Sequence, residues 1–150
     1  GVRKEYYMNT FNDGGRKEAG YKGTTGDCGT RAIAIACQLP YQEVYDMVIK
    51  HAGRERISKR KKSKSHPRTG IYMVTMKRIM EALGWKWKAT MGIGTGCKVH
   101  LDSDELPKGR IICRVSKHYV ALIDGIINDT HDCSRDGGRC VYGYWYKENA

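Results

Sequence analysis

No stretch of this 150-residue chain stays apolar over the roughly 18 residues that a membrane-spanning helix needs. The first residues, Gly1 to Glu5, lack the apolar core of a secretory signal, so we expect neither a membrane protein nor export by a cleaved signal. Full disorder is excluded as well, because 40% of the residues are hydrophobic. We expect one domain over residues 1–150, a monomer, with a real core.

Cys-x-x-Cys pairs, the usual sign of a metal site, are absent. The six cysteines occupy positions 28, 37, 97, 113, 133 and 140. This density is low for a disulfide scaffold and no export signal accompanies it, so we expect mostly reduced thiols in a cytoplasm. Three soft ligands, His131, Cys133 and Cys140, leave a zinc site open as an alternative, without an evident fourth ligand. We predict no metal and no cofactor.

Acidic residues are few beside basic ones: 16 Asp and Glu against 27 Lys and Arg give a net charge of +11. Residues 54–68 alone hold eight Lys or Arg and one Glu, a local charge of 8 − 1 = +7. With one aliphatic residue, Ile57, this segment is expected to be a flexible surface loop, here called the basic loop. It either contacts nucleic acid or an acidic partner, or serves as a solvated insertion. The cations offered for such binding are Lys59, Arg60, Lys61, Lys62 and Lys64.

The apolar pattern changes its period halfway along the chain. Residues 1–26 are polar and rich in glycine, which is typical of an irregular arm. Helical spacing predicts three helices, over residues 27–38, 41–51 and 73–83. Alternating or short apolar runs then predict strands over residues 85–89, 110–115, 118–123, 126–130 and 141–146. The fold class is therefore α+β, with N-terminal helices packed on a C-terminal antiparallel β-sheet.

Cys28 lies where Gly26-Asp27-Cys28-Gly29 is expected to enter the first helix, with Thr25 or Asp27 as its cap. The positive end of a helix dipole stabilises a thiolate, and the small neighbours leave room for a substrate. A small apolar residue packed under a helix start would explain the same position. Cys28 is thus a candidate nucleophile that needs a base.

His118 is the candidate base, because it opens a predicted strand, a rigid element from which to aim an imidazole. Asp124-Gly125 predicts a two-residue hairpin turn. In that register Asp129 lies diagonal to His118 on the same face, within hydrogen-bonding reach, and can orient the imidazole. A register shifted by one residue would substitute Asn128, and His131 is a competing base on the same face.

A cysteine at a helix start, a histidine opening a strand and an aspartate on the next strand form a specific order. The leading segments are 13–16 (DGGR), 26–36 (GDCGTRAIAIA) and 41–45 (YQEVY), and the trailing ones are 106–109 (LPKG) and 118–130 (HYVALIDGIINDT). Together they resemble papain-like cysteine peptidases in a compact form, similar to the peptidase domains of bacteriocin-exporting transporters, and most closely a group of small phage and bacterial proteins. The resemblance covers most of the chain except the basic loop.

The resemblance implies a papain-like fold with Cys28 as nucleophile, His118 as base and Asp129 as the orienting residue. Its implied location is the cytoplasm of a bacterial host, if the protein is phage-encoded. Papain-like enzymes place a glutamine six residues before the cysteine to stabilise the oxyanion, whereas Lys22 stands there in this chain. The backbone N–H of Cys28 is one replacement donor. Thr24, Thr25 and Lys22 are candidates for the second.

Two functions from different classes follow. The first is a cysteine-nucleophile hydrolase or acyl-transfer enzyme acting on a protein or peptide, and the sequence does not separate peptidase, isopeptidase, deamidase and acyltransferase. The second is a catalytically inactive binding protein that contacts a host protein or nucleic acid through the basic loop. Salt-dependent binding that survives Cys28→Ala would distinguish the second from the first.

Overall fold

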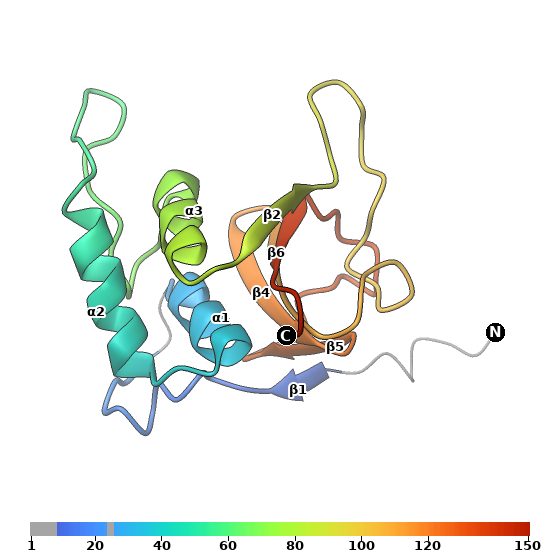
Figure 1. The fold of residues 1–150 in the computed structure, drawn as a ribbon, viewed down its shortest axis with the longest axis horizontal. Helices are drawn as coiled ribbons and strands as arrows, with labels where there is room; N and C mark the ends of the chain where they lie inside the picture. The colour runs from blue at the N-terminus through green and yellow to red at the C-terminus, as the bar shows by residue number, and fades with distance from the viewer. Residues whose placement is uncertain (1–8, 24–25) are drawn as a thin grey trace.

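Three helices and a six-stranded sheet make up the computed structural model, which describes residues 9–23 and 26–150 (Figure 1). The helices are α1 (Cys28–Cys37), α2 (Tyr41–Ala52) and α3 (Met73–Ala82). The strands are β1 (Asn9–Phe11), β2 (Lys86–Ala89), β3 (Arg110–Val115), β4 (His118–Ile123), β5 (Ile126–Asp129) and β6 (Gly143–Tyr146). The α+β class, all three helices and five of the strands agree with the sequence prediction, with boundaries that shift by no more than two residues.

The sheet is mixed, which corrects the expectation of a purely antiparallel one. Its strand order is β1-β5-β4-β3-β6-β2, and every neighbouring pair is antiparallel except β1 and β5. Residues 9–11, expected to belong to an irregular arm, pair in parallel with Ile127 to Asp129. All three are exposed, and an edge strand without a buried face has no apolar alternation by which to recognise it.

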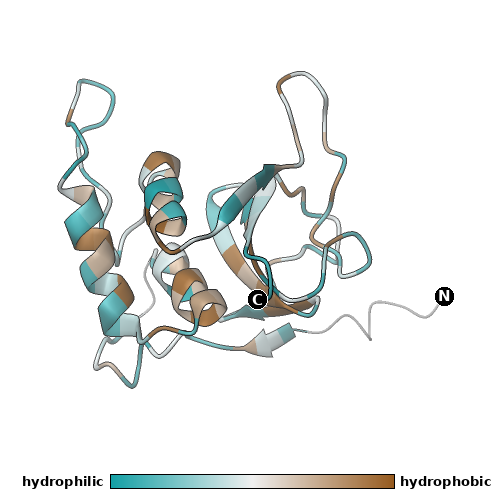
Figure 2. Ribbon diagram, in the orientation of Figure 1, coloured by the Kyte–Doolittle hydropathy of each residue, from teal (hydrophilic) through white to brown (hydrophobic). Residues whose placement is uncertain are grey.

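Helix α1 lies between the sheet and α2, packing on β3 and β4 on one side and on α2 on the other (Figure 1). Its alanine-rich sequence suits this buried place, and Figure 2 shows apolar colour along most of it. The helix ends where Gln38 adopts a left-handed conformation (φ 57°) and donates its N–H to the carbonyl of Ala34. Pro40 then fixes the start of α2.

Both faces of the sheet are covered. One face packs on the helices through a core that includes Ile33, Val44, Met76, Met80, Tyr119 and Trp145. The opposite face is covered by the long connections after β2 and β5, and its core includes Leu101, Leu106, Val120, Leu122, Ile127 and Cys133. Because side chains alternate along β4, Val120 and Leu122 lie on the second face while Tyr119 and Ala121 lie on the first.

A disulfide joins Cys97 and Cys140, whose Cα atoms are 5.8 Å apart. The other four cysteines are free, so the thiols are mostly reduced, with this one exception. Because Cys140 is bonded to Cys97, the alternative zinc site of His131, Cys133 and Cys140 does not form here. In the described part of the chain no helix has the length and apolar character needed to cross a membrane.

Candidate active site

Three segments that are distant in sequence meet at one end of the sheet. His118 is the first residue of β4 and Asp129 is the last residue of β5, so the antiparallel hairpin brings them to the same end of the sheet. The predicted hairpin register is confirmed: Ile123 pairs with Ile126, and Ala121 with Asn128. Cys28, the first residue of α1, reaches this end of the sheet from the helical layer.

His118 is held by Asp129 through a short hydrogen bond of 2.7 Å between Nε2 and the carboxylate Oδ2. Both side chains are largely withdrawn from solvent, at 12% and 3% exposure. Burial alone opposes the charged imidazolium, but hydrogen bonds with Asp129, Cys133 and Cys28 raise the pKa of His118 to about 11. The same bond, with the backbone N–H of Thr130 and the charge of Arg31, outweighs burial and lowers the pKa of Asp129 to about 2. The imidazole is therefore a cation beside a carboxylate at neutral pH.

Cys28 and His118 line the same cavity, so the thiol lies beside the imidazole. Burial alone would raise the pKa of this thiol, but the interaction with the His118 side chain and its positive charge, the Tyr119 backbone and the Arg31 guanidinium together lower it. A thiolate beside an imidazolium is the activated form of a cysteine nucleophile.

A second thiol, Cys133, approaches the same imidazole. Its Sγ, a ring nitrogen of His118 and a carboxylate oxygen of Asp129 all lie within 4.8 Å of one another. Burial and the negative charge of Asp129 raise the pKa of the Cys133 thiol, and the opposing bond to His118 does not overcome them. Cys133 therefore remains a neutral S–H group. Its side chain, with those of His118 and Asp129, has the donor types that zinc prefers, although a full set needs a fourth ligand.

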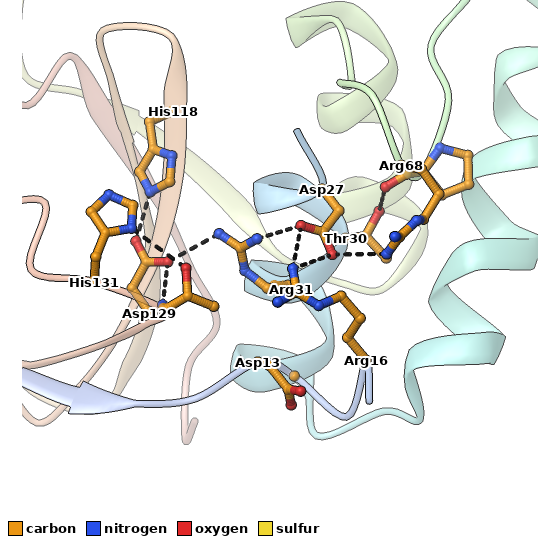
Figure 3. A network of polar contacts seen from close by, with 12 residues as sticks. Asp13, Arg16, Asp27, Thr30, Arg31, Arg68, His118, Asp129 and His131 are labelled. Carbon is orange, nitrogen blue, oxygen red and sulfur yellow. Dashed lines mark hydrogen bonds and ion pairs between the residues drawn. The ribbon is translucent and has the colours of Figure 1, made fainter. Parts of the chain in front are cut away.

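Asp129 is itself anchored by a chain of buried charges that runs into the helical layer (Figure 3). Arg31, on α1, donates Nη2 to Asp129 Oδ1 at 3.0 Å and Nη1 to Asp27. Asp27 is fully buried and also accepts from Arg16 at 3.1 Å and from the Tyr41 hydroxyl at 2.8 Å. These contacts connect the carboxylate that holds His118 to α1, α2 and the segment before α1, and so fix its position.

Two cavities open beside Cys28, and Cys28 lines both. The first, about 330 Å³, lies between the start of α1, the end of the basic loop and the turn from β3 to β4. The second, about 300 Å³, lies on the His118 side and is lined by Arg16, Arg31, His118 and His131 among others. The thiol is thus reachable from two directions, as a nucleophile that must accept one substrate segment on each side requires.

The basic loop forms one wall of the first cavity because its end is fixed against α1. Thr30 donates its hydroxyl to the carbonyl of Pro67 at 2.7 Å. Glycine is needed where the chains meet: a Cβ on Gly26 would lie 3.0 Å from the carbonyl oxygen of Thr69, and one on Gly29 would lie 2.8 Å from a methyl of Ile71. The loop's beginning is tied down by buried Glu55, which accepts from the backbone N–H of Ser65 at 2.7 Å.

The remaining predicted residues fall outside the His118 cluster. Asn128 points to the other face, where its side chain accepts from Asn12 at 3.1 Å. Lys22 is exposed, its carbonyl accepts from Arg68, and it lines neither cavity among the described residues. Thr24 and Thr25 lie outside the described residues. The His131 ring is 5.6 Å from that of His118, centroid to centroid, and exposed.

Within the basic loop, Lys61 forms an ion pair with Glu55 at 3.0 Å and lies over the Tyr72 ring. Lys64 lines the first cavity, whereas Lys59, Arg60 and Lys62 are exposed and line neither cavity. The prediction that the loop is flexible remains a prediction, although both of its ends are fixed.

Sequence reasoning missed Arg31 and Asp27 as supports and Cys133 as a second thiol at the imidazole. The spacing of Asp27 and Arg31, four apart at a helix start, was a visible ion-pair signal. No sequence pattern links Cys133 to His118.

Comparison with known proteins finds no matching family model, no matching curated protein and no matching solved structure.

Proposed function

We propose that this protein is a cysteine-nucleophile hydrolase or acyl-transfer enzyme with a papain-like arrangement, in which Cys28, His118 and Asp129 act together. The observation that carries the proposal is a thiol of lowered pKa on a helix start, lining one cavity with an imidazole that a buried carboxylate holds at 2.7 Å. A structural ion pair would not require a cysteine next to two cavities.

The chemistry follows from the protonation states. The Cys28 thiolate attacks a carbonyl carbon, and a tetrahedral oxyanion forms. Because Asp129 engages Nε2, Nδ1 of His118 is the nitrogen that gives a proton to the departing amine or other leaving group. The acyl group is then a thioester on Cys28. Water attacks it, His118 takes a proton from that water, and the free acid and the thiolate are regenerated.

The oxyanion needs donors other than a glutamine side chain. The backbone N–H groups of Cys28 and Gly29 belong to the first turn of α1, where no carbonyl of the same helix can accept from them. We propose the N–H of Cys28 as one donor, reinforced by the helix dipole.

The test is alkylation of Cys28 by iodoacetamide from pH 5 to 9, followed site by site by mass spectrometry. Cys28 is expected to react at pH 6 to 7, where an ordinary thiol of pKa about 8.5 is mostly protonated. His118→Ala should slow that reaction by about tenfold or more, and His100→Ala, a change at a half-buried histidine that lines neither cavity beside Cys28, should leave it unchanged. A larger loss in His131→Ala than in His118→Ala would assign the base to His131. Equal reactivity of Cys28 and the other free thiols would remove the nucleophile.

A covalent readout separates catalysis from mere thiol reactivity. An aryl ester of an acylated amino acid should leave an acyl group on Cys28, visible by intact mass, in the wild type but not in Cys28→Ser. Turnover of that acyl-enzyme should be slower in His118→Ala, because water then lacks its base.

Binding through the basic loop is the second candidate function, favoured by the exposure of Lys59, Arg60 and Lys62 without a carboxylate partner among the described residues. Binding of nucleic acid or an acidic protein should then weaken steeply with salt and survive Cys28→Ala. Loss of binding in Cys28→Ala would show that binding depends on the thiol and would contradict this second function.

A further inference from the structure

The basic side chains around Cys28 fall into two sets. In the first set each cation has a carboxylate: Arg16 and Arg31 contact Asp27, and Arg31 also contacts Asp129. The second set consists of Lys64, Arg114 and Lys117, which line the first cavity. Within the described residues none of these three lies within 4.0 Å of a carboxylate. Of the basic side chains around Cys28, those without a carboxylate among the described residues therefore line the first cavity.

The three cations come from three different segments. Lys64 belongs to the basic loop, Arg114 to β3, and Lys117 to the turn between β3 and β4, where it lines both cavities. Arg114 is positioned rather than free, because its guanidinium lies over the ring of Tyr119 at 4.4 Å and is half-buried. The Tyr119 hydroxyl is in turn fixed to the carbonyl of Ile71 at 2.9 Å. A guanidinium held on an aromatic face keeps its N–H edge for an anion.

The rest of the cavity wall includes Ile71, Tyr72 and Tyr119 beside the polar Ser63 and Thr69, and among the described residues no Asp or Glu lines either cavity. Its volume, about 330 Å³, is at the small end of ligand pockets, a size suited to one or two residues of a peptide. A cleft that is lined by positive charges and by partly apolar walls attracts anions and strengthens their binding.

Resting on the proposed acyl-transfer function, we propose that the first cavity binds a carboxylate of the substrate next to the carbonyl that Cys28 attacks. Lys64, Arg114 and Lys117 are then specificity-determining residues for an acidic peptide. The carboxylate has two possible sources, an Asp or Glu side chain or a free C-terminus. On this proposal the basic loop contributes Lys64 to substrate selection, and its remaining charges extend the attracting field outward.

The first experiment needs no knowledge of the natural substrate. Iodoacetate and iodoacetamide alkylate the same thiol, but only iodoacetate carries a carboxylate, so the ratio of their rates at Cys28 measures attraction of an anion. Arg114→Gln and Lys117→Gln should each lower this ratio by about threefold, and together by about tenfold. Lys98→Gln, an equal change of charge at an exposed residue that lines neither cavity, should leave it unchanged.

The outcomes separate the two proposals. If Cys28 reacts slowly with both reagents, the nucleophile assignment fails and this inference fails with it. If Cys28 reacts quickly but the ratio stays the same in Arg114→Gln and Lys117→Gln, the nucleophile stands and the carboxylate site is wrong. Since Lys117 is exposed at a turn, its variant is expected to fold even if Arg114→Gln does not.

The second experiment identifies the source of the carboxylate. Acylation by the 4-nitrophenyl ester of N-acetylglutamate is compared with that by the N-acetylglutamine ester, and peptide acids are compared with the corresponding peptide amides. Faster reaction of the glutamate ester assigns an acidic side chain, and faster reaction of the peptide acid assigns a free C-terminus. Either preference should be lost in the Arg114→Gln, Lys117→Gln double variant. No preference in either pair would overturn the proposal.

Discussion

Cys28 and Cys133 reach the same imidazole from two different regions of the molecule. Cys28 arrives from the helical layer, on the first turn of α1, and its pKa is lowered by His118, the Tyr119 backbone and Arg31 despite burial. Cys133 arrives from the connection after β5, and burial together with Asp129 raises its pKa. Both thiols lie beside His118, so proximity to an imidazole does not by itself activate a cysteine.

The difference lies in the charge beyond the imidazole. Sγ of Cys133 is within 4.8 Å of an Asp129 oxygen as well as of His118, so a thiolate there would face a carboxylate. Cys28 instead has Arg31 and a helix start behind it. A positive field on one side and a negative one on the other give a single imidazolium one thiolate partner and one thiol partner.

The largest expected effect is the difference in reactivity itself. At pH 7 Cys28 should react with iodoacetamide faster than Cys133 by about tenfold or more, because its pKa is lowered while that of Cys133 is raised, and because the 3% exposure of Cys133 limits access. Peptide mapping of partially alkylated native protein measures both rates in one sample. Comparable rates would contradict the assignment of opposite protonation states.

Removing the Asp129 carboxylate should reduce the difference between the alkylation rates of Cys28 and Cys133, because it slows the first and speeds the second. In Asp129→Asn the pKa of His118 falls, so Cys28 loses thiolate character, while Cys133 loses the negative charge that raises its own pKa. We expect the ratio of rates to shrink about tenfold. Unfolding free energy should fall by about 2 to 3 kcal/mol, because buried Arg31 loses one of its two carboxylates. An unchanged ratio, with Asp136→Asn as the exposed control, would mean that Asp129 does not set it.

The parts of this site that the sequence predicts are those that depend on local chain geometry. The start of α1 places Cys28 beside a helix dipole, and the Asp124-Gly125 turn fixes the register of β4 and β5. That register places Asp129 diagonal to His118 on the same face, where the two side chains hydrogen-bond. Such features follow from spacing within some 20 residues of chain.

What the sequence does not predict depends on packing between distant segments. Cys133 reaches His118 because its connection folds back over the sheet, and Arg114 lines the first cavity because β3 lies next to β4. The edge strand β1, which pairs with β5, has no apolar alternation because all of its residues are exposed. Close approaches at Gly26 and Gly29 likewise need the folded partner before the requirement for glycine is visible.

The contribution of the Asp129 carboxylate to stability should be lost in acid. The pKa of Asp129 is about 2 in the folded protein against about 4 unfolded, so the unfolded chain binds more protons between these values. Its contribution to stability is complete above about pH 5 and is lost as the pH falls through 2, amounting to about 2 kcal/mol. Urea unfolding at several pH values should show this loss in the wild type and not in Asp129→Asn. Glu55, also near 2, contributes equally to both proteins and cancels. Parallel curves for the two proteins would contradict the assigned shift.

The smallest effect on Cys28 reactivity is expected from removing the unactivated thiol, Cys133. Cys133→Ala removes a neutral thiol from the core on the second face of the sheet, so the rate of Cys28 alkylation should change by less than about threefold, while unfolding free energy falls by about 1 kcal/mol. Cys113→Ala is the matched control, since Cys113 is a fully buried thiol of the same core whose pKa is raised by burial. If the two variants lose similar stability and Cys28 keeps its rate in both, Cys133 acts only through packing. A tenfold fall confined to Cys133→Ala would instead make the second thiol a positioning residue for His118, since its loss would then lower the charge on the imidazole that Cys28 uses.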